Sequence, residues 1–214
     1  MAIVTSMRAA KGRNRLVTVS LDSGEALELT VDVVVEKRLK VGQSLSELIV
    51  QGLLQEDRAQ RCYTAAIRSL SYRARSEAEV RLKLRQRSFE ADAIERAISR
   101  LRQQGLVDDQ AFAQFWKDSR QSIRPRSGMM VKQELRQKGV SAEVAQGVAS
   151  EVDDEESAFS AARKRALRLT ALDWTDFHRL LGGYLRRRGF SYEVVRKTVD
   201  RVWQEKGGVP GEHE

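Results

Sequence analysis

Cysteine, proline and aromatic residues are scarce in this sequence of 214 residues. The single cysteine, Cys62, cannot form an internal disulfide, which fits a reducing compartment. Only two prolines, Pro125 and Pro210, could interrupt a helix, so long helical stretches are possible. Aromatic residues make up 6% of the chain, and this low content favours helices with large solvated faces over one thick core.

Long hydrophobic runs are absent as well. No apolar stretch approaches the roughly 18 residues that a membrane-spanning helix needs. The opening MAIVTSMRAAKGRNR lacks the apolar centre of a signal peptide. We therefore expect a cytoplasmic protein with no membrane partner.

Residues that commonly carry catalysis or bind metals are few. The two histidines, His178 and His213, have no metal-ligand spacing around them, and no phosphate-binding glycine motif occurs. Cys62 lies on an apolar helix face without a nearby histidine, so we expect a buried structural thiol. The acids DDEE at 153–156 favour a helix start over a metal site, because the helix dipole stabilises carboxylates there. We expect no enzymatic activity, no cofactor and no bound metal.

Charged residues are plentiful, at 32% of the chain, and the net charge of +8 is unevenly distributed. Residues 1–60 carry 8 basic and 8 acidic side chains, residues 61–138 carry 18 and 9, and residues 139–214 carry 12 and 13. The positive excess therefore lies in the middle of the chain. Such a segment is typical of proteins that bind nucleic acid or an acidic protein surface.

A ten-residue pattern recurs in the helical part of the chain. LRQKGVSAEV occupies 135–144, LRRRGFSYEV occupies 185–194, and a weaker copy, LRQRSFEADA, begins at Leu84. The spacing of about 50 residues indicates a repeat architecture.

Each copy predicts a joint between two helices. Gly139 and Gly189 occur where a helix would end in the left-handed conformation, which is free of steric cost only for glycine. Ser141 and Ser191 are then placed to cap the next helix. In the first copy Ser88 occupies the glycine position, so we expect a looser or differently shaped joint there.

The N-terminal part follows another pattern. The alternation in RLVTVSLDSGEALEL predicts a β-hairpin within 15–30, with Gly24 in its turn. VDVVVEKRLKVG and SLSELIVQGLL predict two short helices that Gly42 separates and that pack against the hairpin.

From about residue 60 the hydrophobic period becomes helical and predicts three repeats of three helices. Ser76 and Glu79 form a capping box at one helix start. We expect a mainly α fold, with three tandem repeats in an elongated curved array after a small hairpin and short helices. The predicted segments are an extension at 1–58, repeats at 59–106, 107–153 and 154–206, and a flexible tail at 207–214.

These features resemble the RecX family, regulators of the bacterial recombinase RecA. The resemblance rests on SYRARSEAEVRLKLRQR, LVDDQAFAQFWKDSR and SGMMVKQELRQKGV, whose order and spacing match the family over about residues 60–205. Ser88 departs from the family's usual glycine, and the resemblance implies little about the N-terminal extension. It implies three three-helix units that bind along the groove of a RecA–DNA filament and down-regulate strand exchange, in DNA recombination, DNA repair and the SOS response.

Basic side chains return at two fixed positions of the repeat. The first position holds Arg85, Arg136 and Arg186, and the second holds Arg87, Lys138 and Arg188. A stacked array would present them as a basic stripe, although cations near helix C-termini are also favoured by the helix dipole in an ordinary solvated face. Two linkers carry further arginines, which suit phosphate or carboxylate groups or are merely solvated. The predicted partner-binding residues are Arg73, Arg75, Arg85, Arg87, Arg124, Arg126, Arg136, Lys138, Arg186 and Arg188.

The aromatic residues are predicted to be structural. Asp108 or Asp109 should cap a helix on which Phe112, Phe115 and Trp116 fill the core between repeats. Core positions are likewise expected for Trp174, Tyr184 and Trp203. Only FWK at 115–117 is a candidate for stacking on a nucleobase, which needs exposed rings beside basic residues.

Three functions therefore compete: a non-enzymatic regulator of the RecA filament, a general basic nucleic-acid-binding repeat protein, and an adaptor for another protein. The ordered resemblance favours the first. The expected partners are the RecA filament and single- or double-stranded DNA, and the protein itself is expected to be a monomer. The sequence leaves open whether the basic residues contact DNA phosphates or RecA carboxylates, and whether the protein caps the filament or blocks its groove.

Overall fold

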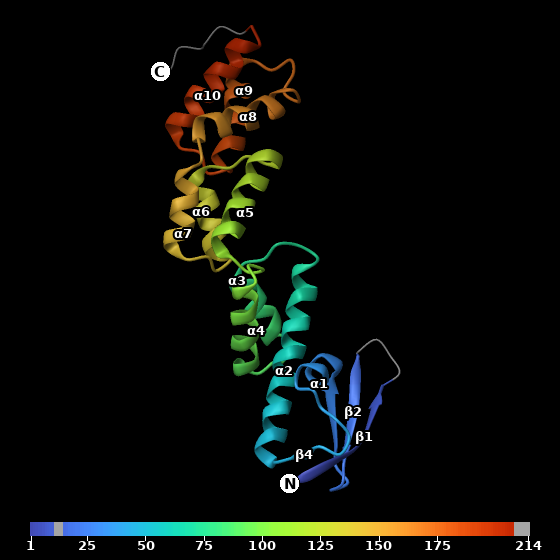
Figure 1. Ribbon diagram of the computed structural model, residues 1–214. Coiled ribbons are helices and arrows are strands. Elements are labelled where there is room, and N and C mark those ends of the chain that lie inside the picture. Colours follow the sequence, from blue (N-terminus) through green and yellow to red (C-terminus); the bar gives the residue numbers. More distant parts are fainter. Residues whose placement is uncertain (11–14, 208–214) are drawn as a thin grey trace. The chain divides into compact units, whose positions relative to one another are not determined.

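The structure, a computed structural model, describes residues 1–10 and 15–207. The chain forms two compact units, Met1–Val107 and Asp108–Glu214, called unit 1 and unit 2 below. Figure 1 shows strands only in unit 1, and the described part of unit 2 is helical. Apart from residue 207, the predicted flexible tail lies outside the described residues.

Unit 1 begins with a four-stranded antiparallel sheet of order β3-β2-β1-β4. Its strands are β1 (Ala2–Ala9), β2 (Leu16–Leu21), β3 (Ala26–Thr30) and β4 (Ser44–Leu45). The predicted hairpin is confirmed as β2 and β3, and Gly24 in its turn has φ +86°. The other two strands were not predicted, because β1 has a single fully buried side chain, Val4, and β4 is only two residues long.

The two short helices predicted after the hairpin are only partly correct. The first exists as α1 (Val31–Glu36), but the second is the start of a 24-residue helix, α2 (Glu47–Leu70). The predicted boundary between residues 58 and 59 falls inside α2, because no proline or helix-ending glycine interrupts that stretch. Gly42 has φ +85° and lies in the turn before β4 rather than at the end of α1.

A buried carboxylate ties α2 to the sheet. Asp57 is 4% exposed, and its Oδ1 accepts a hydrogen bond of 2.6 Å from the backbone N–H of Thr30. Its Oδ2 accepts a second bond of 2.6 Å from Nε of Arg61, and Nη2 of the same arginine donates to the carbonyl of Glu28 over 2.9 Å. The sheet and the first three-helix group are therefore joined through one helix into a single unit.

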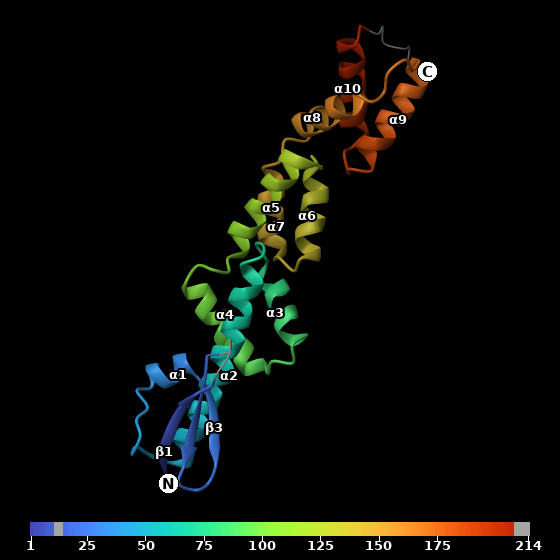
Figure 2. The same cartoon turned by 90° about the vertical axis from the view of Figure 1, so that its right-hand side faces the viewer.

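The second half of α2 packs against α3 (Glu77–Arg85) and α4 (Ala91–Gln103), and these three helices are the first three-helix group (Figure 2). Their shared core includes Cys62, Val80, Leu84, Ile98 and Leu101, each at most 1% exposed. Ser76 caps α3 through its bond to the Glu79 N–H, as the capping box predicts.

Unit 2 contains two further three-helix groups, which confirms three tandem three-helix domains. The second group consists of α5 (Asp109–Ile123), α6 (Gly128–Gln137) and α7 (Ala142–Ser150). The third consists of α8 (Asp154–Ala166), α9 (Trp174–Arg186) and α10 (Tyr192–Glu205). Asp153 caps α8, so the DDEE sequence is a helix start as predicted.

The joints between helices have one shared backbone geometry. Gly139 and Gly189 have φ values of +80° and +87°, and Ser141 and Ser191 cap the following helices, as predicted. At the first joint Glu90 forms no side-chain capping bond with α4, so the predicted difference is found in the capping; the turn itself is the same, because Ser88 adopts φ +60°. Its N–H donates to the Arg85 carbonyl, as the glycine N–H groups donate to the carbonyls of the arginines three residues before them.

One aromatic prediction needs correction. Phe112 is 4% exposed and Trp116 packs against the same core, but Phe115 is 56% exposed. On α5 the buried stripe includes Phe112, Ala113 and Trp116, so Phe115 lies on the solvated side. Asp108 is the residue that caps α5.

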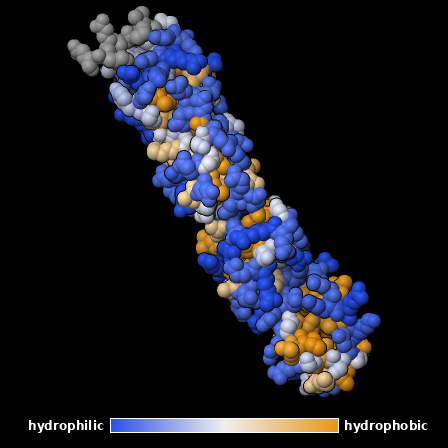
Figure 3. All heavy atoms as spheres, turned by 60° about the vertical axis from the view of Figure 1, so that its left-hand side comes forward, coloured by the Kyte–Doolittle hydropathy of each residue, from blue (hydrophilic) through white to orange (hydrophobic). Residues whose placement is uncertain are grey.

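The other three aromatic residues with a predicted core position pack as predicted. Trp174, Tyr184 and Trp203 pack against the third core around Phe177. The space-filling view shows apolar side chains in separate patches among polar ones on the visible face (Figure 3).

A candidate arginine-lined interface

The linker between α5 and α6 brings the second and third three-helix groups together. Ser127 caps α6 and is fully buried, and its backbone N–H donates to the carbonyl of Arg188 over 3.1 Å. In return, a guanidinium nitrogen of Arg188 donates to the carbonyl of Pro125 over 2.9 Å. These reciprocal bonds fix the linker against the α9–α10 joint.

An arginine-lined depression of about 250 Å³ lies at this contact. Three of the predicted residues, Arg124, Arg126 and Arg188, line it together with Arg187 and Tyr184. No carboxylate from the described residues lines the depression, so its described lining is strongly basic. Guanidinium groups are planar forks of donors that fit phosphate and carboxylate groups.

The arginines of the depression differ in how far groups of the protein already pair with their charge. Arg126 forms an ion pair with Glu134, a carboxylate that also accepts bonds of 2.7 Å from Arg120 and from the indole of Trp116. The guanidinium of Arg188 lies 4.4 Å from the ring centre of Tyr184. Arg124 and Arg187 are exposed, and neither has a carboxylate partner among the described residues. These two are the side chains available to an anionic ligand.

The first repeat position is exposed in all three joints. Arg85, Arg136 and Arg186 are solvent-exposed, and Arg136 also donates to the carbonyl of Val140 over 2.6 Å. None of the three has an ion pair within the described residues. Their exposure leaves them accessible to a partner.

The second repeat position has a structural component in unit 2. Lys138 lies over the ring of Trp116 at 4.1 Å, as Arg188 lies over Tyr184, and both cations are half-buried. In unit 1 the corresponding Arg87 is exposed. A cation over an aromatic ring stabilises the fold by about 0.5–1 kcal/mol at such sites, so packing explains part of the recurrence of cations at this repeat position.

The arginines of the other linker are engaged within unit 1. Arg73 forms two hydrogen bonds of 2.9 Å with the carboxylate of Glu79, which raises the pKa of this guanidinium despite opposing desolvation. Nε of Arg75 donates to the carbonyl of Ser69 over 3.0 Å. Neither arginine lies in the depression, which belongs to unit 2.

The sequence reasoning missed Arg187 and gave Tyr184 only a core position. The signal for Arg187 was present in the run of three arginines at 186–188, but the repeat comparison selected its two neighbours. Tyr184 contacts the third core and also lines the depression, so its core prediction is confirmed but incomplete.

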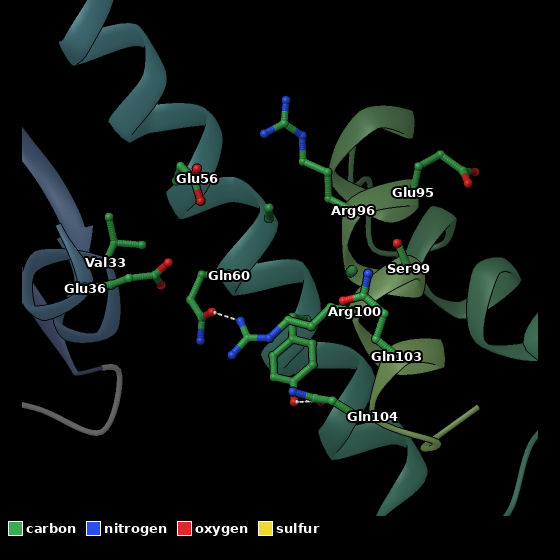
Figure 4. Close-up of a pocket in the computed structure, with 13 residues that line it drawn as sticks. Val33, Glu36, Glu56, Gln60, Glu95, Arg96, Ser99, Arg100, Gln103 and Gln104 are labelled. Carbon is green, nitrogen blue, oxygen red and sulfur yellow. Dashed lines mark hydrogen bonds between the residues drawn. The ribbon is translucent and has the colours of Figure 1, made fainter. Parts of the chain in front are cut away.

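A larger concavity, of about 820 Å³, lies in unit 1 between α1, α2 and α4 (Figure 4). Its lining is of mixed charge, and its central side chains bind one another. Arg100 donates to Gln60 over 2.8 Å and lies 4.1 Å from the ring centre of Tyr63, whose hydroxyl donates to Gln104 over 2.6 Å. The donors and acceptors at the centre of the pocket are thus already paired with one another.

The described residues provide little for catalysis. Burial raises the pKa of the Cys62 thiol to about 11, which makes it a poor nucleophile. The ring of His178 packs against Trp174 in a tilted arrangement with centroids 5.3 Å apart, and no group of three potential metal ligands occurs in the parts of the chain that the structure covers. In the same residues no helix is long and apolar enough to cross a membrane.

Comparisons with known proteins agree on one family. The first, second and third three-helix domains of RecX match residues 62–101, 108–148 and 153–199. The chain is 28% identical over 205 residues to the regulatory protein RecX of Clostridium botulinum (strain Eklund 17B / Type B), covering 93% of this chain and 95% of the relative. It is 34% identical over 151 residues to that of Amycolatopsis mediterranei (strain U-32), covering 67% and 86%. A crystal structure of regulatory protein RecX is similar with a TM-score of 0.73 and 24% identity, over 94% of this chain and all of the other.

Proposed function

The chain belongs to the RecX family, and from that premise we propose that it binds the filament of RecA on DNA and lowers the filament's activity without catalysing a reaction. The relatives are named regulatory proteins, which supports a regulatory role. Binding in the filament groove follows from the resemblance described above.

The arginine-lined depression is the observation that carries this proposal. A RecA–DNA filament offers phosphates and acidic side chains, and Arg124 and Arg187 have guanidinium groups without a carboxylate partner in the described residues. Tyr184 and Pro125 hold Arg188 beside them, so the basic groups are positioned before a ligand arrives. Such preorganisation reduces the entropy that binding costs. The exposed arginines of the first repeat position supply further contacts.

The experiment that tests the proposal measures the DNA-dependent ATP hydrolysis of RecA with increasing amounts of this protein. A filament regulator should inhibit at ratios far too low to coat the DNA. The alternative, a general nucleic-acid-binding protein, should need near-saturating amounts. Absence of inhibition even at saturation would contradict the proposed regulation.

Matched variants connect this activity to the depression. Arg124→Glu with Arg187→Glu should weaken inhibition at least tenfold. Arg168→Glu with Arg196→Glu makes the same change of charge at exposed arginines of unit 2 outside the depression. Equal effects of the two pairs would mean that total charge, and not the depression, determines binding.

A further inference from the structure

A second group of arginines surrounds a cleft in unit 1. The cleft has a volume of about 420 Å³ and lies between the N-terminal sheet, one side of α2 and the α3–α4 joint. Arg61 and Arg68 come from α2, Arg15 precedes β2, and Arg87 follows α3. Four guanidinium groups from distant parts of the sequence thus line one space.

Acidic residues compensate only part of this charge. Asp32 lines the cleft 3.8 Å from Arg15, and the buried Asp57 pairs with Arg61 at 2.6 Å. Arg68 and Arg87 are exposed and have no ion pair within the described residues. Two positive charges therefore remain uncompensated, on the two arginines that are not needed to hold the sheet.

A buried hydroxyl next to this space is also without a partner. Thr30 lines the cleft, is 9% exposed, and its Oγ1 has no hydrogen-bond partner among the residues that the structure describes. Because this oxygen is itself enclosed, it leaves polarity unsatisfied beside the cleft and is not counted as a contact for the ligand.

We propose that this cleft binds phosphate groups of a nucleic-acid strand. A single carboxylate would leave one of the two free arginines unpaired, whereas a nucleic-acid strand carries phosphates at short, regular intervals, so neighbouring phosphates can pair with both. Consecutive phosphodiesters bring one negative charge each, which matches the two uncompensated charges. The inference goes beyond the proposed function and does not rest on it, since it concerns bare nucleic acid and unit 1.

The cleft also gives the N-terminal sheet a role. Arg15, Thr30 and Asp32 come from the segment before α2, whereas Arg68 and Arg87 come from the first three-helix group. The hydrogen bonds of Asp57 with Thr30 and Arg61 hold the sheet side of the cleft against the helical side. The sheet thus completes a basic site that the three-helix group alone would leave open on one side.

The test is fluorescence anisotropy with a fluorescein-labelled single-stranded oligonucleotide and the full chain. Arg68→Gln with Arg87→Gln should weaken binding about tenfold near physiological salt. It should also reduce the slope of log K against log salt by about 1.4, the value for two lost contacts to a single strand. Lys40→Gln with Lys83→Gln removes the same charge from exposed lysines of unit 1 outside the cleft and should weaken binding less than threefold.

Three results would overturn the inference. Equal weakening by both pairs would assign the effect to net charge. Loss of poly-glutamate binding with unchanged oligonucleotide binding would identify a carboxylate site instead. Competition by inorganic phosphate without any effect of the cleft variant on the oligonucleotide would identify a site for small anions. Circular dichroism melting of each variant verifies folding, and Arg68→Lys with Arg87→Lys, which keeps the charge, should recover part of the affinity.

Discussion

Removing the carboxylate of Asp57 should destabilise unit 1 selectively. Asp57→Ala leaves the buried N–H of Thr30 without its acceptor, at a cost of about 1–3 kcal/mol. The ion pair with Arg61 adds only ~1 kcal/mol, since the side chain of Arg61 is 40% exposed and solvent screens it. The free energy of unfolding should therefore fall by about 2–4 kcal/mol. Asp57→Asn, which keeps an oxygen for Thr30, should cost about half as much.

The sequence provides a separate probe for each unit. Cys62, the single cysteine, is buried in unit 1, and the three tryptophans, Trp116, Trp174 and Trp203, all lie in unit 2. In a urea titration, labelling of Cys62 by a thiol reagent reports unfolding of unit 1, and tryptophan fluorescence reports unit 2. With a slope of about 1.5 kcal/mol per molar urea, Asp57→Ala should lower the labelling midpoint by about 2 M. The tryptophan midpoint should stay unchanged.

The neighbouring carboxylate supplies the control. Glu56 precedes Asp57 on α2 and pairs with Lys37 at 3.0 Å, but both side chains are about two-fifths exposed. Glu56→Ala should therefore cost ~1 kcal/mol or less. If Asp57→Ala labels with the same midpoint as Glu56→Ala, the buried carboxylate does not hold the sheet to α2, and the reasoning fails.

Three further predictions concern the joints, the pH dependence and the repeated arginines. Ser88→Gly should stabilise unit 1 by about 0.5–1 kcal/mol, since glycine adopts its positive φ without strain. Gly189→Ala should destabilise unit 2 by about 2–4 kcal/mol, since a Cβ there would lie 2.5 Å from Oγ of Ser127. Labelling of Cys62 in urea measures the effect of Ser88→Gly, and tryptophan fluorescence measures that of Gly189→Ala. An unchanged midpoint would contradict the prediction for that variant. Burial alone would raise the pKa of Glu77, but hydrogen bonds from Arg102 and Arg81 outweigh it and hold the pKa below its ordinary value. This stabilisation is present above the unfolded-state pKa of about 4.3 and is lost as the pH falls through the folded-state pKa. The urea midpoint of Cys62 labelling should therefore drop between about pH 5 and pH 3. The drop should be less steep in Glu77→Gln, which has no carboxyl group at this position to titrate. Arg85→Glu, Arg136→Glu and Arg186→Glu together should abolish inhibition of RecA with little change in melting, although each single change does little; a folded triple variant that still inhibits would leave these arginines as a solvated face.

The features that the sequence predicted depend on local chemistry. A glycine with a following cap serine specifies a helix joint within a few residues, and the alternation around Gly24 specifies a hairpin. The features that it missed depend on distant contacts. The extent of α2 is fixed by packing against both the sheet and α4, and Ser88 is held at positive φ although its own preference opposes that conformation.

The candidate site also depends on distant contacts that the sequence did not predict. Arg124 and Arg126 were predicted from one linker and Arg188 from a joint, but nothing local indicated that they share a depression. That juxtaposition arises from the reciprocal bonds between the linker and the α9–α10 joint. The cleft of unit 1 depends in the same way on the sheet folding onto α2.

Equivalent repeat positions therefore do not have equivalent roles. Arg73 and Arg124 occupy corresponding linkers, each followed by a buried cap serine, Ser76 or Ser127. Arg73 nevertheless donates from both terminal nitrogens to Glu79, so a ligand would have to displace an existing carboxylate. Arg124 has no such competitor among the described residues, so an anion that binds its guanidinium has to displace only water. The repeat thus preserves the fold of each linker, while the acidic residue nearby decides whether its arginine stabilises the protein or remains free to bind.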